Sequence, residues 1–211
     1  MQNQNKRQNC LSWDETLMQM ARLIAKRSKD PNTQNGACIV DKNNVIVGLG
    51  YNGFPRGCAD ESLPWGREGD FLDKKYAYVV HAEVNAIYNA NQSVKGCKLY
   101  CTLFPCNECA KSIIQTGITE IIYESDKYHE EKEWVASRRM LNLAGISYRA
   151  FQPKYNMEFV PMSGDKNEVD SRQTSAAEIF DISRAKGFGQ KASAKNIQST
   201  NKIIFTDIFS N

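Results

Sequence analysis

The sequence has little of several features that would each define a class of protein. Lys and Arg number 27 and Asp and Glu number 24, which leaves a net charge of only +3 with histidine neutral. So small an excess argues against a nucleic-acid partner bound mainly by neutralising its phosphates. Apolar runs such as residues 76–80 and 45–47 are far shorter than the roughly 18 residues that a membrane helix needs. The sequence therefore predicts neither a nucleic-acid nor a membrane partner.

Histidine is also scarce, and cysteine occurs in an odd number. The chain has seven cysteines and two histidines, His81 and His129. The first ten residues are polar and lack the apolar core of a signal peptide, so a cytoplasmic protein is expected. In that compartment an odd cysteine count argues against a disulfide framework and favours metal or thiol chemistry.

The 211 residues suffice for one domain and a short appendage. Ser12 and Glu15 form a capping box, and Trp13, Leu17, Met20 and Ile24 after it predict the buried stripe of a helix that ends before Pro31. The pattern then predicts strands at 36–40 and 45–49, a helix at 81–90, a strand at 98–103, a helix at 106–116, a strand at 120–123, a helix at 130–144 followed by a capping Gly145, and a strand at 146–151. This order predicts an α/β fold, a three-layer α/β/α sandwich around a mixed sheet of about five strands.

Composition changes near residue 153. Residues 153–211 are rich in Ser, Asn and Lys, with a second capping box at Ser175 and Glu178 and an apolar patch at 203–205. We predict one domain over residues 12–152 and a partly ordered C-terminal extension over residues 153–211, to which the sequence assigns no function.

One group of residues has the chemistry of a metal site. His81-Ala82-Glu83 is followed by Pro105-Cys106-Asn107-Glu108-Cys109. One imidazole and two thiolates suit Zn²⁺, and three protein ligands leave a fourth position for a water molecule, as in catalytic zinc sites. Glu83 is close enough in sequence to reach that water. The alternative is a closed structural site, for which His129, Cys58, Cys97 or Cys101 would have to supply the fourth ligand; it leaves the His-x-Glu pattern unexplained.

The pattern H-x-E…P-C-x-x-C is a signature of zinc-dependent nucleobase deaminases. The chain more narrowly resembles the deoxycytidylate (dCMP) deaminases, within the cytidine and deoxycytidylate deaminase superfamily, over about residues 12–151 and not over the extension. The segments that carry this resemblance are SKDP at 28–31, GA at 36–37, GYNG at 50–53, LPW at 63–65, HAEVNAI at 81–87, LFPCNECAK at 103–111 and SDKYH at 125–129.

The resemblance implies a hydrolase that converts dCMP into dUMP and ammonia on the route to thymidylate. It implies a cytidine-deaminase-like fold, with His81, Cys106 and Cys109 as zinc ligands and Glu83 as the residue that moves protons. It also implies a homo-oligomer, often a hexamer, that is activated by dCTP and inhibited by dTTP at a separate site.

Substrate-binding residues are less defined. Asn52 occupies the place where related deaminases put an amide near the sugar and base, although a turn asparagine is an equal alternative. Gly36 and Ala37 are expected on the strand that faces the zinc helices, where they would let the pyrimidine approach the backbone. Lys127 and Tyr128 follow a strand and are candidates to bind the 5′-phosphate or stack on the base, with a solvated loop as the alternative.

A long segment from Tyr51 to Asp73, rich in Gly, Pro and acidic residues, predicts a functional loop. With the resemblance it becomes the candidate effector site. Its proposed contacts are backbone N–H groups near Gly53 and Gly57, the charge of Arg56, Asp60 or Glu61 for a Mg²⁺ ion, and Arg27 from the first helix. Glycine-rich loops alone are weak support, and basic residues on a helix are usually solvated.

One departure bears on specificity, because Asn35 stands where these deaminases usually have valine. Other readings remain open: a deaminase of dCTP, cytidine or tRNA adenosine, a riboflavin-pathway enzyme, or an inactive zinc scaffold of the same fold. The intact Glu83 argues against loss of activity, and the small net charge argues against a tRNA substrate.

Overall fold

The computed structural model describes residue 7 and residues 9–160. Residues up to Lys154 belong to one compact unit and the remainder to a second; the fold below is that of the first. The predicted capping box at residues 175–178 and the apolar patch at 203–205 lie outside the described residues.

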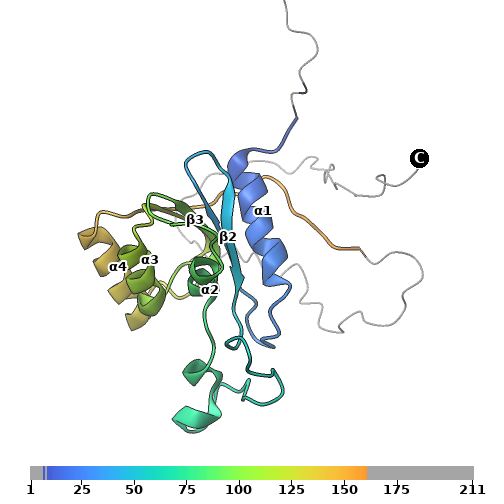
Figure 1. Ribbon diagram of the computed structural model, residues 1–211, viewed down its shortest axis with the longest axis vertical. Coiled ribbons are helices and arrows are strands. Elements are labelled where there is room, and N and C mark those ends of the chain that lie inside the picture. Colours follow the sequence, from blue (N-terminus) through green and yellow to red (C-terminus); the bar gives the residue numbers. More distant parts are fainter. Residues whose placement is uncertain (1–6, 8, 161–211) are drawn as a thin grey trace, which may run out of the picture. The chain divides into compact units, whose positions relative to one another are not determined.

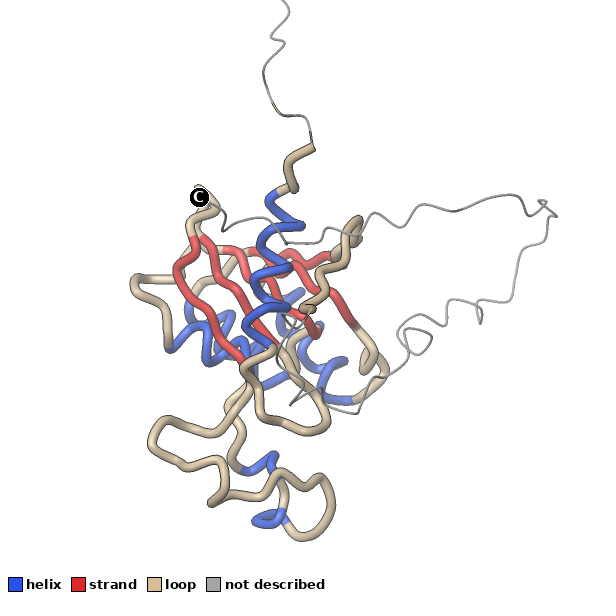
Figure 2. The backbone as a smooth tube through the Cα atoms, turned by 90° about the vertical axis from the view of Figure 1, so that its right-hand side faces the viewer, coloured by secondary structure: helices blue, strands red, loops and turns tan. Residues whose placement is uncertain are grey.

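A five-stranded mixed sheet forms the centre of the unit (Figure 2). Its strands are β1 (Gly36–Val40), β2 (Ile46–Tyr51), β3 (Lys98–Leu103), β4 (Glu120–Ser125) and β5 (Ser147–Ala150), in the order β2-β1-β3-β4-β5. β1 runs antiparallel to both β2 and β3, whereas β3, β4 and β5 are parallel to one another. The predicted mixed sheet is confirmed.

Helices cover both faces of this sheet (Figure 1). α1 (Trp13–Ala25) packs on one face, and α2 (Ala82–Tyr88), α3 (Asn107–Thr116) and α4 (Lys132–Leu143) pack on the other. Two ends follow their sequence signals: Ser12 Oγ accepts a hydrogen bond from Glu15 N at 3.2 Å, and Gly145, with φ of +71°, follows the last turn of α4. The three-layer α/β/α sandwich is thus confirmed. None of the helices in the described part of the chain is both long and apolar enough to cross a membrane.

The buried face of α1 differs from the predicted stripe. Trp13 is 58% exposed, and the buried side chains include Leu17, Met18, Ala21 and Ala25. The reason lies in a close approach between α1 and β1, because a Cβ at Gly36 would lie 1.9 Å from the carbonyl oxygen of Ala21. Small residues on α1 and a glycine on β1 allow this approach, and they rotate Trp13 out of the interface.

The segment between β2 and α2 forms a long loop, here called the 53–80 loop. Its ends are joined by an antiparallel bridge in which Gly53 and Val80 exchange two backbone hydrogen bonds of 3.1 and 2.9 Å. Within it are two short 3₁₀ turns, Phe71–Asp73 and Lys75–Ala77. Figure 1 shows the loop extending beyond the end of the sheet, below α2. The predicted loop is therefore present, and it continues past Asp73 to the start of α2.

Candidate active site

A cavity of about 740 Å³ lies where the parallel strands β3 and β4 end. The carboxyl ends of parallel strands are a common location for ligand sites in helix-flanked sheets. Four parts of the chain line it: the turn after α1 and the strand ends near it (Asp30, Thr33, Asn35, Asn52), the 53–80 loop (Arg67, Lys75, Tyr76, Val79, Val80), the starts of α2 and α3 (His81, Glu83, Val84, Cys106, Asn107, Glu108, Cys109, Ser112), and the segments after β3 and β4 (Leu103, Phe104, Tyr128, Glu131, Glu133, Trp134).

Three possible metal ligands meet in this cavity. His81 Nδ1 lies 3.3 Å from Cys106 Sγ and 3.4 Å from Cys109 Sγ. Tetrahedral zinc, with Zn–N near 2.0–2.1 Å and Zn–S near 2.3 Å, places such N and S atoms about 3.6 Å apart. The ligand atoms of the three residues all lie within 4.8 Å of one another. This donor set and spacing fit a zinc ion.

Local structure explains why the three side chains are available. His81 is the N-cap of α2 and Cys106 is the N-cap of α3, and neither side chain caps its helix. Cys109 lies in the first turn of α3, so it projects on the same side as Cys106. Both N-caps have extended backbone, with φ of −72° in each case, which turns the side chain away from the helix.

The electrostatics of the cluster favour a thiolate on Cys106. Hydrogen bonds from Cys109 and from His81 lower the pKa of Cys106 to about 4. The hydrogen bond with Cys106 in turn raises the pKa of His81 to about 9, although burial opposes that increase. The pKa of Cys109 is raised by its hydrogen bond to Cys106 and by burial. Since His81 and Cys109 must lose protons to bind a metal, metal affinity should fall as pH is lowered.

Glu83 lies beside the cluster without belonging to it. The hydrogen bond from Cys109 Sγ to Glu83 Oε2 is 3.5 Å long, and Glu83 is buried in the first turn of α2. Burial raises the pKa of Glu83, because a buried carboxylate loses its hydration. A carboxyl group in this position beside the metal site is placed to accept and donate protons.

No fourth ligand closes the site among residues 9–160. The group of potential metal ligands found in this range consists of His81, Cys106 and Cys109 alone. Cys101 is fully buried in β3, where its thiol donates to the Ile122 carbonyl at 3.8 Å, and Cys58 is exposed. The described structure therefore favours the open, catalytic type of site over the closed structural one.

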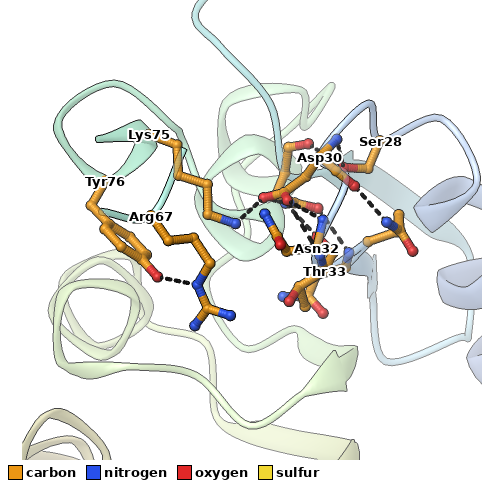
Figure 3. Close-up of polar contacts among 10 residues, drawn as sticks. Ser28, Asp30, Asn32, Thr33, Arg67, Lys75 and Tyr76 are labelled. Atoms are coloured by element: carbon orange, nitrogen blue, oxygen red, sulfur yellow. Dashed lines mark hydrogen bonds and ion pairs between the residues drawn. The ribbon is translucent and has the colours of Figure 1, made fainter. Parts of the chain in front are cut away.

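A polar network around the buried residues Asp30, Asn52 and Lys75 forms part of the cavity lining (Figure 3). Asp30 pairs with Lys75 from the 53–80 loop, and it accepts backbone hydrogen bonds from Asn32 at 2.8 Å and Thr33 at 3.2 Å. Asn52 donates to Asp30 Oδ2 at 3.3 Å and to the Thr33 carbonyl at 2.9 Å. The network thus ties the turn after α1 to the loop.

Asn52, predicted to contact substrate, lines the cavity but is already engaged. Besides these two donor contacts, its Oδ1 accepts a hydrogen bond from Asn35 N at 2.8 Å. Asn35 itself lines the cavity, and its Oδ1 accepts from Thr102 Oγ1 at 3.5 Å. Asn52 therefore holds the start of β1 in place, and Asn35 presents a polar group where the sequence pattern led us to expect an apolar one.

Tyr128 and Lys127, the two candidates after β4, differ in their location relative to the cavity. Tyr128 lines the cavity, and its ring lies 4.8 Å from that of Trp134, which donates a hydrogen bond to the Phe104 carbonyl at 2.9 Å. Lys127 is exposed and does not line the cavity; its Nζ lies 4.9 Å from the Tyr128 ring centroid. Only Tyr128 is placed to contact a ligand in the cavity.

The predicted placement on the side of the zinc helices fits Ala37 but not Gly36. Gly36 packs against α1, on the face of the sheet away from the zinc helices, because its missing Cβ is what lets the Ala21 carbonyl approach. Ala37 does face α2 and α3, but it is fully buried in the core beneath them. Neither residue is among those that line the cavity, and contact of their backbone with a pyrimidine stays a prediction.

Only some of the candidate effector residues lie together in the structure. Arg27, Gly53 and Asp60 line a second, smaller cavity of about 100 Å³ together with Lys29, Tyr51, Phe54 and Trp65. Asp60 forms an ion pair with Lys29. Arg56 instead donates to Asn89 Oδ1, and Gly57, with φ of +89°, occupies a turn; neither lines this cavity.

Sequence reasoning assigned no role to three charged residues of the main cavity, namely Asp30, Arg67 and Lys75. Asp30 could have been noticed, because Asp before Pro is typical of a turn in which the side chain accepts backbone hydrogen bonds. Arg67 and Lys75 lie in a loop without periodicity, and no local signal distinguishes them from solvated residues.

Comparisons with known proteins agree with this geometry. The family model for the cytidine and deoxycytidylate deaminase zinc-binding region matches residues 11–125. Mouse deoxycytidylate deaminase is 57% identical over 169 residues, which cover 79% of this chain and 93% of the mouse protein. The human deoxycytidylate deaminase is 58% identical over 151 residues, covering 71% and 85% respectively. A solved structure of dCMP deaminase from cyanophage S-TIM5 in complex with dCMP and dUMP is 28% identical with a TM-score of 0.53, over 65% of this chain and 95% of that chain.

Proposed function

Because the chain belongs to the cytidine and deoxycytidylate deaminase family, we propose that it is a zinc-dependent hydrolase that converts dCMP and water into dUMP and ammonia. The observation that carries this proposal is the meeting of His81, Cys106 and Cys109 beside Glu83 in one cavity. The names of the mouse and human relatives support dCMP as the substrate, as does the cyanophage enzyme solved with dCMP and dUMP.

His81, Cys106 and Cys109 would hold the zinc ion. When bound, zinc supplies Lewis acidity that lets water act as a nucleophile near neutral pH. The chain's own contribution is a fixed ligand set on the ends of two helices, whose positive dipole ends favour thiolate ligands.

Glu83 would move the protons of the reaction. Its carboxylate takes a proton from the attacking water and delivers it to N3 of the cytosine ring, while the water oxygen bonds to C4. The hydroxyl now on C4 then gives its proton to Glu83, which passes it to the amino group; the C4–N bond breaks, ammonia leaves, and C4 keeps the oxygen as a carbonyl. One carboxyl group serves as base and then acid because each transfer restores it for the next.

The walls of the cavity would position the nucleotide. Tyr128, whose ring contacts Trp134, lines the cavity and offers its phenol to the substrate. Asn52 keeps the start of β1 against the turn after α1, which sets the shape of the wall near Asn35.

Regulation also belongs to this proposal. Activation by dCTP and inhibition by dTTP are supported by the resemblance to dCMP deaminases; of the candidate effector residues, Arg27, Gly53 and Asp60 lie together at the small cavity. A Mg²⁺ ion would arrive with the triphosphate, because Asp60 is already paired with Lys29. The homo-oligomer and the cytoplasmic location remain predictions from the sequence.

The test is ammonia release by the full-length, zinc-loaded protein from dCMP, CMP, cytidine and dCTP. We expect turnover of dCMP and a loss of about 10²- to 10⁴-fold in kcat for Glu83→Gln with zinc content unchanged. A wild-type protein that binds zinc and is inert on all four compounds would contradict the proposal, and activity confined to dCTP or cytidine would reassign the substrate.

A separate experiment tests the regulatory part of the proposal. A dCMP titration of the same protein should give a sigmoidal rate curve that becomes hyperbolic when dCTP and magnesium are added. An identical curve with and without dCTP would remove the regulatory part of the proposal and leave the reaction untouched.

A further inference from the structure

The main cavity has an uneven distribution of charge. Its lining includes five acidic residues but, apart from His81, only two basic ones, Arg67 and Lys75, both on the 53–80 loop; the acidic residues are Asp30, Glu83, Glu108, Glu131 and Glu133. An anionic group that enters the cavity therefore has few cations to bind, and they lie on one wall.

The two cations differ in what they already bind. Lys75 is buried and paired with Asp30, so its charge is compensated. Arg67 is exposed and, within the described residues, forms no ion pair with a carboxylate. Its Nε donates a hydrogen bond of 2.8 Å to the hydroxyl of Tyr76, which leaves the rest of the guanidinium available (Figure 3).

A second phenol lies close to the same guanidinium. The electrostatic neighbours that raise the pKa of Arg67 are Tyr76 first and Tyr128 second. Tyr128 comes from the segment after β4, and its ring contacts that of Trp134 in a tilted arrangement. The Arg67 guanidinium thus lies beside the phenol of Tyr76 on the same loop and near that of Tyr128, and all three residues line the cavity.

We propose that Arg67, with the hydroxyl groups of Tyr76 and Tyr128, binds the 5′-phosphate of the nucleotide substrate. This inference rests on the proposed function, and it assigns the phosphate to Arg67 in place of the predicted Lys127. Arginine suits the role because its planar fork can bind two phosphate oxygens at once. Glu131 and Glu133 repel a phosphate from the other part of the lining, whereas Glu108 is paired with Lys111, so the Arg67 side is the place for the phosphate.

The experiment compares dCMP with deoxycytidine, which differ only in the phosphate. For the zinc-loaded full-length protein, we measure kcat/KM for both compounds with wild type, Arg67→Gln and Arg67→Lys. Arg67→Gln should lower kcat/KM for dCMP about 10-fold, the lower end of the range for hydrogen bonds to charged groups, because Arg67 is exposed to solvent. The value for deoxycytidine should change less than 2-fold, and Arg67→Lys should recover part of the loss.

The matched control Lys74→Gln removes one positive charge from the protein, as Arg67→Gln does. Lys74→Gln alters the same loop next to Lys75 but does not line the cavity, so it should leave the ratio between the two compounds unchanged. Raising the salt concentration should increase KM for dCMP in wild type and much less in Arg67→Gln. A preference for dCMP that is equal in wild type and Arg67→Gln would overturn the assignment, as would a loss in Lys127→Gln with none in Arg67→Gln.

Binding measurements test the phosphate site independently of the deamination reaction. Calorimetric titration with dUMP and with deoxyuridine requires no turnover. Tighter binding of dUMP that depends on Arg67 would support the phosphate site even if the protein failed to deaminate dCMP. Equal affinities of wild type for dUMP and deoxyuridine would overturn it even if deamination occurred.

Discussion

Replacing Lys75 by methionine should destabilise the protein, because it removes one partner of a buried ion pair. The side chains of Lys75 and Asp30 are 7% and 1% exposed, so solvent cannot take the place of the missing charge. Losing one partner of such a pair typically costs 3–5 kcal/mol. Asp30 would still accept hydrogen bonds from Asn32, Thr33 and Asn52, so we expect the low end, about 3 kcal/mol.

Thermal unfolding of the zinc-loaded protein at one fixed concentration measures this effect. For a domain of this size a change of about 3 kcal/mol corresponds to a fall in Tm of roughly 6 to 12 °C. The matched control is Lys29→Met, which removes the same type of side chain from its pair with Asp60, where the two side chains are 59% and 32% exposed. That variant should unfold close to wild type, because exposed pairs contribute little.

The effects of changing Asp30 and Lys75 on the free energy of unfolding should also be coupled. The double variant Asp30→Asn with Lys75→Met should be less destabilised than the sum of the single variants, since the second change then removes no paired charge. Equal Tm values for Lys75→Met and Lys29→Met would refute the argument that burial makes the Lys75–Asp30 pair important to the 53–80 loop.

Two further predictions concern the metal and pH. Cys106→Ser should strip most of the zinc measured in the purified protein, whereas Cys58→Ser, which alters an exposed cysteine outside the cluster, should retain it; equal zinc content in both would contradict the ligand set. The hydrogen bond from Arg149 lowers the pKa of Asp14 below its ordinary value of 3.8, so this carboxylate adds stability above that pH and loses it as pH falls through the lowered pKa. Asp14→Asn should therefore lower Tm at pH 7 and approach wild type in acid, and a difference in Tm that persists unchanged at low pH would contradict this.

The sequence by itself determined the parts of this protein that depend on short stretches of chain. The capping box at Ser12, the left-handed Gly145, and the alternation of strands and helices were sufficient to predict the three-layer sandwich. His81, Glu83, Cys106 and Cys109 were found for the same reason, because a ligand set at the starts of two helices leaves its spacing in the sequence.

Tertiary structure alone decided which side chains form the rest of the cavity. The hydrogen bond between Lys75 and Asp30 joins residues 45 positions apart, and Arg67 meets Tyr128 only because the 53–80 loop folds toward the segment after β4. The close approach of α1 to β1 likewise decided that Gly36 packs on the α1 face of the sheet. Such contacts depend on packing between distant segments, and no periodicity or motif within either segment records them.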